Sequence, residues 1–369
     1  MRPSRRRVPA PAVLALLLAA ACAGAGTAST PGPAAADASG RPVLEVQQSG
    51  TTALLQAVSA PSEAVAWVSG HQATFARTRD GGRTWEAGRV AGVDSALQFR
   101  DVHAASAEVA WLLSAGPGAQ SRVYATTDGG RSWALQHVNP DSAGFYDCLS
   151  FWDAERGFVY GDAVDGRLVV LETTDGGRTW ARVDAARLPA AQPGEGGFAA
   201  SGTCTAALTA GGRAHGWIAT GNAARPRVLH TADGGRTWTA VELPLPGGEG
   251  IGATSVAFRD AAVGVAVGGD IGRRDAAGDR VARTADGGRT WAVGGDPGFV
   301  GAVYGAAYAG GGAGAALFAV GPGGASWSAD DGRGWTRADS AAYWGLGFAS
   351  GRVGWLVGPR GRVVKVRVP

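Results

Sequence analysis

The segment "TTDGGRTW" (residues 173–180) recurs along the chain, and this recurrence decides the fold. Close copies stand at residues 78–85, 126–133, 231–238 and 284–291, and a divergent copy, "SADDGRGW", occupies residues 328–335. The six segments, which we call boxes, begin 44 to 58 residues apart. Self-similarity at such a period indicates a repeat architecture, in which each unit is one small supersecondary structure.

Every residue type in the box has a structural task. An aspartate side chain can accept bonds from backbone N–H groups and fix a turn, and a following glycine adopts positive φ without strain. The tryptophan inserts a large apolar ring between packed layers. We therefore predict that the boxes are structural and not catalytic. The residues concerned are Asp80, Asp128, Asp175, Asp233, Asp286 and Asp330, with Trp85, Trp133, Trp180, Trp238, Trp291 and Trp335.

A short apolar strand ending in glycine, such as "GWIATG" or "GWLVG", forms a second repeat. It occurs seven times, against six boxes, and the last unit ends after three strands. An N-terminal strand at residues 44–47 would complete that unit and leave no sheet edge open. Residues 42–369 thus predict one all-β domain, a seven-bladed β-propeller closed by an N-terminal strand. A six-bladed ring with an appended unit is the alternative.

The N-terminus reads as a targeting segment. "MRPSRRR" is a basic region, an apolar alanine- and leucine-rich run follows, and residues 1–22 together are typical of a secretory signal. Cys22 directly follows "LLLAAA", so lipidation of Cys22 and plain cleavage are both open. Residues 23–41 are rich in alanine, glycine and proline and predict a flexible linker. We expect an exported protein, either periplasmic or a membrane-anchored lipoprotein.

Charge and cysteine content narrow the function classes. The chain has 34 Lys and Arg against 31 Asp and Glu, but four arginines lie in the signal, so the remainder is close to neutral. This charge balance does not indicate a nucleic-acid-binding surface, which would need clustered positive charges. Cys148 and Cys204 fall on predicted inner strands of neighbouring blades, and an oxidising compartment favours a disulfide between them. Two buried free thiols are the alternative.

The boxes match the pattern S/T-x-D-x-G-x-T-W of the Asp box, or bacterial neuraminidase repeat. Together with the preceding "GW-x-x-G" strands, they make residues 42–369 resemble the photosystem II stability/assembly factor family and its non-photosynthetic bacterial relatives, some of which are labelled oxidoreductase. In that family the boxes lie at the blade periphery, away from the ligand face. The resemblance implies an exported, non-enzymatic and monomeric propeller that binds a protein segment or envelope ligand and assists assembly.

Enzymatic alternatives find weaker support. The "Arg-Ile-Pro" stretch of sialidases is absent, and no glycine-rich motif stands in a strand–turn–helix context, so we predict no cofactor. The five histidines are scattered without ligand spacing, and no metal is expected. A glycan-acting hydrolase or lyase would need paired channel carboxylates, for which Asp101 and Asp147 are the first candidates, with Asp153 and Asp162 behind them. Turn capping is the simpler reading of these residues.

Polar and aromatic residues gather on the predicted inner strands and suggest a binding site at a channel mouth. The pattern also fits ordinary inner-strand packing. The expected occupant is a protein or peptide partner in the cell envelope. The candidate residues are Asp101, His103, Tyr146, Asp147, Trp152, Ser201, Thr203, Tyr304 and Trp344.

Overall fold

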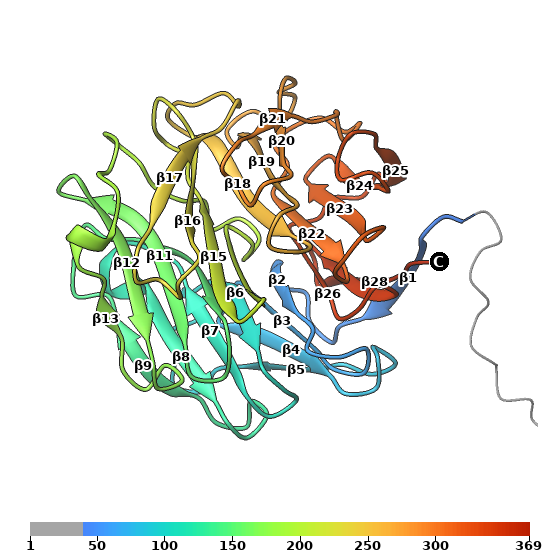
Figure 1. The fold of residues 1–369 in the computed structure, drawn as a ribbon. Helices are drawn as coiled ribbons and strands as arrows, with labels where there is room; N and C mark the ends of the chain where they lie inside the picture. Colours follow the sequence, from blue (N-terminus) through green and yellow to red (C-terminus); the bar gives the residue numbers. More distant parts are fainter. Residues whose placement is uncertain (1–39) are drawn as a thin grey trace, which may run out of the picture. The chain divides into compact units, whose positions relative to one another are not determined.

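The computed structural model describes residues 40–369, which form seven four-stranded antiparallel sheets (Figure 1). The predicted signal, Cys22 and nearly all of the predicted linker lie outside the described residues. Within the described part, the only helical elements are two short 3-10 turns, η1 (Gly118–Gln120) and η2 (Ala185–Arg187). No helix there is long and apolar enough to cross a membrane.

Each sheet is one blade, and in six blades the four strands follow one another along the chain. Blade 1 contains β2 (Leu55–Ser59), β3 (Ala66–Gly70), β4 (Thr74–Thr78) and β5 (Glu86–Arg89). Blade 2 contains β6 (Phe99–Ala104), β7 (Ala110–Ser114), β8 (Arg122–Thr126) and β9 (Ala134–Val138). Blade 3 contains β10 (Tyr146–Phe151), β11 (Gly157–Val164), β12 (Arg167–Thr173) and β13 (Ala181–Arg182).

The next three blades repeat this order. Blade 4 contains β14 (Thr205–Ala210), β15 (Arg213–Ala219), β16 (Arg227–Thr231) and β17 (Thr239–Glu242). Blade 5 contains β18 (Ile251–Phe258), β19 (Gly264–Asp270), β20 (Val281–Thr284) and β21 (Ala292–Val293). Blade 6 contains β22 (Gly305–Ala309), β23 (Ala316–Gly321), β24 (Gly324–Ser328) and β25 (Thr336–Asp339).

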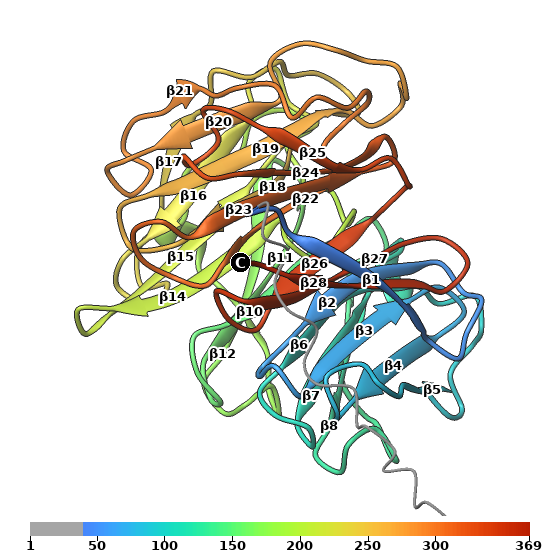
Figure 2. The same cartoon turned by 90° about the vertical axis from the view of Figure 1, so that its right-hand side faces the viewer.

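Blade 7 joins the two ends of the propeller. Its strands β26 (Gly345–Phe348), β27 (Val353–Val357) and β28 (Arg362–Arg367) come from the C-terminus, and β1 (Val43–Gln48) pairs antiparallel with β28 (Figure 2). The first strand of each blade contacts the first strand of the next, and β26 contacts β2. The seven-bladed prediction with a closing N-terminal strand is confirmed, and the six-bladed alternative is wrong.

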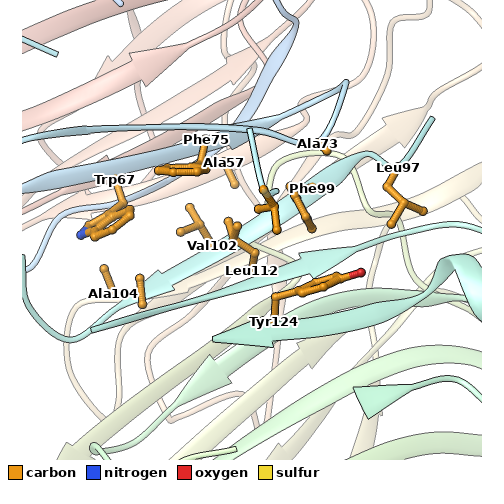
Figure 3. Close-up of a cluster of buried hydrophobic side chains, with 12 residues drawn as sticks. Ala57, Trp67, Ala73, Phe75, Leu97, Phe99, Val102, Ala104, Leu112 and Tyr124 are labelled. Atoms are coloured by element: carbon orange, nitrogen blue, oxygen red, sulfur yellow. The ribbon is translucent and has the colours of Figure 1, made fainter. Parts of the chain in front are cut away.

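The hydrophobic core is divided among the blade interfaces. Seven clusters of buried side chains lie one between each pair of neighbouring blades. In the first, Trp67 and Phe75 of blade 1 meet Val102, Leu112 and Tyr124 of blade 2 (Figure 3). Because each blade buries both of its faces in this way, removing one blade would expose two cores.

Each box tryptophan packs back onto the preceding blade. The ring centroids of Trp133 and Trp67 are 6.0 Å apart, and Trp67 Nε1 donates to the backbone oxygen of Ser106 at 2.9 Å. Blade 7 has no box, and its interface with blade 6 keeps the inner-strand contact of Phe348 with Phe318, with ring centroids 4.7 Å apart. The indoles therefore fasten neighbouring blades, as their residue type predicts.

The carboxylate of the box aspartate makes its hydrogen bonds within its own turn. Asp175 Oδ1 accepts bonds from the Thr173 hydroxyl and the Thr179 N–H, both at 2.9 Å, and Oδ2 accepts from the Thr179 hydroxyl at 2.7 Å. The Thr179 bonds lower the pKa of Asp175 to about 2. Four other box aspartates make the same three bonds, namely Asp80, Asp128, Asp233 and Asp286. Of these three bonds, Asp330 makes only the two to Oδ1, from the Ser328 hydroxyl and the Gly334 N–H, because Gly334 has no hydroxyl. These carboxylates keep little bonding capacity for a ligand.

Candidate functional site at the plugged channel mouth

One segment crosses the space between the inner strands. Residues 196–204, which we call the plug, lie between η2 and β14. Gln56 Nε2 of blade 1 donates to the backbone oxygens of Ala199 and Ala200 at 3.4 and 3.3 Å. The Ser201 hydroxyl donates to the Tyr304 oxygen of blade 6 at 2.7 Å. The plug therefore links blades that lie apart on the ring.

Further contacts place the plug against blades 2 and 5. The Thr203 hydroxyl lies 2.7 Å from the Ser255 hydroxyl, and Val256 N donates to the Thr203 oxygen at 2.9 Å. Gly202 has φ +72°, and a Cβ there would come 2.4 Å from Asp101 Oδ1. Only glycine fits this conformation and this close approach without displacement.

A disulfide holds one end of the plug, and an ion pair holds the other end. Cys204 forms a disulfide with Cys148 of β10, with Cα atoms 5.9 Å apart. At the other end, the fully buried carboxylate of Glu195 pairs with Arg227 and accepts a 2.9 Å bond from the Thr220 hydroxyl. Cys148 belongs to blade 3, and Arg227 and Thr220 belong to blade 4. The two ends of the plug are therefore fixed to blades 3 and 4, the blades that it connects along the chain.

A cavity of about 380 Å³ opens above the plug. Its size lies within the range of typical ligand pockets. The plug backbone lines one side, and every one of the seven blades or the loops that lead into them supplies a side chain. The wall residues are Leu54, Gln56, His71, Arg100, Phe145, Asp147, Asp162, Asn222, Ile271, Tyr304 and Trp344.

Blade 3 gives the cavity an acidic wall. Asp147 is 1% exposed, and its Oδ2 accepts no hydrogen bond of standard geometry from any described residue. Asp162 Oδ1 accepts from Gly197 N at 3.0 Å. Burial raises the pKa of Asp147 well above its ordinary value, and the nearby Asp162 carboxylate raises it further, while Arg100 opposes the shift. Burial also raises the pKa of Asp162.

Blades 6 and 7 give the cavity an aromatic wall. The rings of Tyr304 and Trp344 meet edge to face with centroids 5.5 Å apart, and both side chains are partly exposed. In a ring of seven, blades 6 and 7 lie farthest from blade 3, so the aromatic wall faces the acidic wall. Ile271 of the loop after β19 lines the cavity as well and is 40% exposed.

Blade 1 contributes a neutral polar pair. His71 Nε2 lies 2.7 Å from Gln56 Oε1. Burial lowers the pKa of His71, and the charge of Arg100 lowers it further. The imidazole is therefore neutral at physiological pH and leaves Arg100 as the cation of the cavity wall.

Three of the predicted ligand-binding residues line this cavity: Asp147, Tyr304 and Trp344. Asp101 does not, because its Oδ1 and Oδ2 accept 2.7 Å bonds from the N–H groups of Val102 and Leu149. Burial raises the pKa of Asp101 to about 8. This carboxyl ties blade 2 to blade 3 through its bond from Leu149 and lies outside the cavity wall.

Two more predicted residues are placed between blades. His103 packs 5.2 Å from Phe151 and 6.0 Å from Trp111, and burial lowers its pKa to about 4. Trp152 donates from Nε1 to the His215 oxygen at 2.7 Å. Neither lines the cavity above the plug.

The remaining predicted residues also lie elsewhere. Ser201 and Thr203 belong to the plug and are bonded to each other at 2.7 Å, so they fasten the plug. Tyr146 faces a separate cavity of about 240 Å³ between blades 2 and 3, where its hydroxyl lies 3.1 Å from His137 Nε2. Asp153 is a turn residue that accepts from the N–H groups of Glu155 and Arg156.

Sequence reasoning missed several wall residues, namely Gln56, His71, Arg100, Phe145, Asn222 and Ile271. Many wall residues sit one place before or one place after the first residue of an inner strand. Aligning the seven units on that position would therefore have found Gln56 and Phe145. The part of the chain that the structure describes holds no group of three or more His, Cys, Asp or Glu side chains suited to a metal ion.

Comparison with solved structures agrees with the architecture. The chain is similar to a structure described as YCF48 bound to D1 peptide and to YCF48 from Cyanidioschyzon merolae, each with TM-score 0.59 and 18% identity. These matches cover 88% of this chain and 97% and 98% of the two YCF48 chains. U3-55K is also similar, with TM-score 0.60 and 11% identity over 88% of this chain and 98% of its own.

No protein-family model matches the chain, and no curated protein matches it. At identities of 11–18%, the structural similarities establish the β-propeller fold and nothing about activity.

Proposed function

We propose that this protein is a binding propeller whose cavity above the plug receives an extended segment of a partner protein. The observation that carries the proposal is the convergence of side chains from all seven blades on one cavity, where two partly exposed aromatic rings face a buried carboxylate with an unsatisfied oxygen. Apolar rings with a few fixed polar groups are the usual composition of a recognition pocket.

The plug favours a segment that enters and leaves by the same mouth. Its bonds to blades 1, 3, 5 and 6 obstruct passage through the ring. A structural neighbour, YCF48, is described as bound to the D1 peptide, which supports peptide binding as a use of this fold. That similarity concerns the fold alone and carries no partner over to this chain.

The sequence of residues 1–22 extends the proposal to the cellular location of the protein. We infer that the chain is exported, with or without a lipid on Cys22, and assists assembly of a complex in the cell envelope without catalysing a reaction. A glycan-acting hydrolase is the rival function. It would have to use Asp147 with Asp162, since the carboxylate of Asp101 is occupied by two backbone N–H groups.

Site-directed photo-cross-linking in the native host tests the proposal. Ile271, on the cavity wall, is replaced by p-benzoylphenylalanine, and the matched control carries the same residue at Leu135, which is 50% exposed on β9. We expect a partner segment to cross-link at position 271 and not at 135. The cross-link should be lost when Tyr304→Ala and Trp344→Ala are added to the first protein.

Two outcomes would overturn the proposal. Equal cross-linking at both positions, or cross-linking that survives the loss of both rings, would mean that the cavity is not the binding site. Release of sugars from envelope glycans by the mature chain, abolished by Asp147→Asn, would establish the hydrolase.

A further inference from the structure

We propose that the bound segment carries a lysine or arginine whose side chain enters the cavity between the acidic wall of blade 3 and the aromatic wall of blades 6 and 7. This inference rests on the proposed function and names the chemistry that the cavity selects.

The first argument is the unsatisfied oxygen of Asp147. A buried carboxylate oxygen without a donor is costly, and buried polar groups are rarely left in that state. The N–H groups of Gly197 and Ala199 lie close enough to lower the pKa of Asp147, but neither makes a hydrogen bond of standard geometry to Oδ2. The guanidinium of Arg100 donates from Nε and Nη2 to Gln98 Oε1 at 3.0 and 2.7 Å. Arg100 and Asp147 form no ion pair among the described residues. Oδ2 of Asp147 therefore keeps acceptor capacity that no described residue uses with standard geometry.

The second argument is the convergence of two carboxylates on one point. Gly197 donates its N–H to Asp162 Oδ1 at 3.0 Å, and a Cβ at Gly197 would come 2.6 Å from Asp147 Oδ2. Both acidic groups thus lie against the same plug residue. Two like charges at one site repel each other, and an incoming cation relieves that repulsion.

The third argument is the wall on the opposite side. Tyr304 and Trp344 present aromatic rings to the cavity, and a cation over such a ring gains roughly 0.5–2 kcal/mol from the ring quadrupole. Carboxylates alone would also attract a hydrated metal ion. Carboxylates that face aromatic rings match instead an ammonium or guanidinium group on an aliphatic stem.

The charges around Asp147 set a pH dependence. Arg100 approaches from β6, Asp162 and Tyr160 from β11, and neutral His71 lies on the cavity wall. With both carboxylates ionised, the cavity has a net charge of about −1, and with one proton shared between them it is neutral. Because a cation favours the ionised pair, binding releases a proton and weakens as the pH falls.

Defined peptide pools provide the test. Fluorescein-labelled hexapeptides, acetylated and amidated to remove terminal charges, are randomised except at a central position fixed as arginine, lysine, norleucine or glutamate. Norleucine matches the lysine stem without its charge. We expect the arginine or lysine pool to bind at least tenfold more tightly than the norleucine pool by fluorescence anisotropy at pH 7.5, and this preference to shrink at pH 5.

The variants assign the preference to the site. Asp147→Asn and, as a second variant, Asp162→Asn should each reduce the preference to threefold or less while norleucine binding persists. Glu242→Gln, which alters a 57% exposed carboxylate on β17, should leave the preference unchanged. Melting curves establish that each variant is folded.

The two proposals fail in different ways. If norleucine binds as tightly as lysine and all binding disappears in Tyr304→Ala with Trp344→Ala, the segment-binding function stands and the cationic preference is wrong. If no pool binds, both are overturned.

Discussion

The box turns and the plugged cavity use the same residue type in opposite states. Asp175 at a box turn is bonded to Thr173 and Thr179, and its pKa is lowered to about 2. Asp147 in the cavity is buried, its Oδ2 accepts no hydrogen bond of standard geometry from a described residue, and burial raises its pKa. An aspartate that recurs with the repeat makes its hydrogen bonds to residues of its own turn and stabilises the fold. Asp147, which does not recur with the repeat, keeps an oxygen that accepts no hydrogen bond of standard geometry from a described residue.

The same contrast separates the aromatic residues. Trp133 and the other box tryptophans pack between blades, where their rings stabilise the ring of sheets. Trp344 precedes β26 and is partly exposed in the cavity. Residues that keep the repeat period therefore build the scaffold, and the candidate site is lined by residues that depart from the period.

The largest expected effect is on the pH dependence of stability. The folded pKa of Asp101 is about 8, above the value of 3.8 that applies when the chain is unfolded, so folding favours the protonated form. Its contribution is complete below pH 3.8 and is lost as the pH rises through about 8, at up to about 1.4 kcal/mol per pH unit. Asp147, whose pKa is also raised, adds to this loss.

Thermal melts between pH 5 and 9 measure this effect. We expect the free energy of unfolding to fall with rising pH over this window, and to fall less steeply in Asp147→Asn, which no longer titrates at that position. The box aspartates act in the opposite sense, since Asp175 and Asp286, each with a pKa near 2, lose their contribution only as the pH falls below about 4. Parallel profiles for Asp147→Asn and the unaltered chain would show that the cavity carboxylate is not strained.

The next effect in size concerns the plug. The Cys148–Cys204 disulfide spans 56 residues, and closing a loop of that length contributes about 4 kcal/mol by the chain-entropy argument. Replacing both cysteines by alanine should lower the free energy of unfolding by about 2–4 kcal/mol in guanidinium titrations. Because the bond holds the plug under the cavity, peptide binding should weaken as well.

Reduction of the unaltered chain with dithiothreitol provides an independent control. It should reproduce the loss seen in the double alanine variant and leave that variant itself unchanged. A stability loss without any effect on peptide binding would separate the plug from the cavity.

The sequence predicted the scaffold well because the same sequence pattern occurs in nearly every blade. Six boxes and seven apolar strands defined seven blades, and the missing strand of the last blade pointed to β1. Each copy reinforces the others, so an error at one unit changes little. Residue chemistry also predicted the structural task of Trp133 and Asp175.

The site was predicted only in part because it depends on contacts between distant segments. Asp147, Tyr304 and Trp344 were found as polar or aromatic residues at inner-strand starts, and they line the cavity. Asp101 has the same composition signal, but the N–H of Leu149 on the neighbouring blade occupies it. The plug could not be foreseen, since residues 196–204 show no periodicity and their partners lie on other blades.

The smallest expected change in stability comes from removing one hydroxyl group, either in a box turn or in the cavity. Comparing the two losses tests the contrast between these regions. Thr78 Oγ1 of the first box is buried, accepts from Gly82 N at 2.8 Å and donates to Asp80 Oδ1 at 2.9 Å. Thr78→Val keeps the shape but leaves the Gly82 N–H unpaired, so the free energy of unfolding should fall by about 1–3 kcal/mol. Thr78→Ser, which retains the hydroxyl, should recover most of that loss.

Tyr304→Phe is the matching change in the cavity, where the hydroxyl makes no hydrogen bond with a described residue. Its removal should alter stability by less than about 0.5 kcal/mol, as at other sites without such a bond. Urea titrations of the three variants test the pair. A loss in Tyr304→Phe as large as that in Thr78→Val would mean that the aromatic wall belongs to the scaffold, and the division between repeated structure and unrepeated site would fail at the point where the binding proposal depends on it.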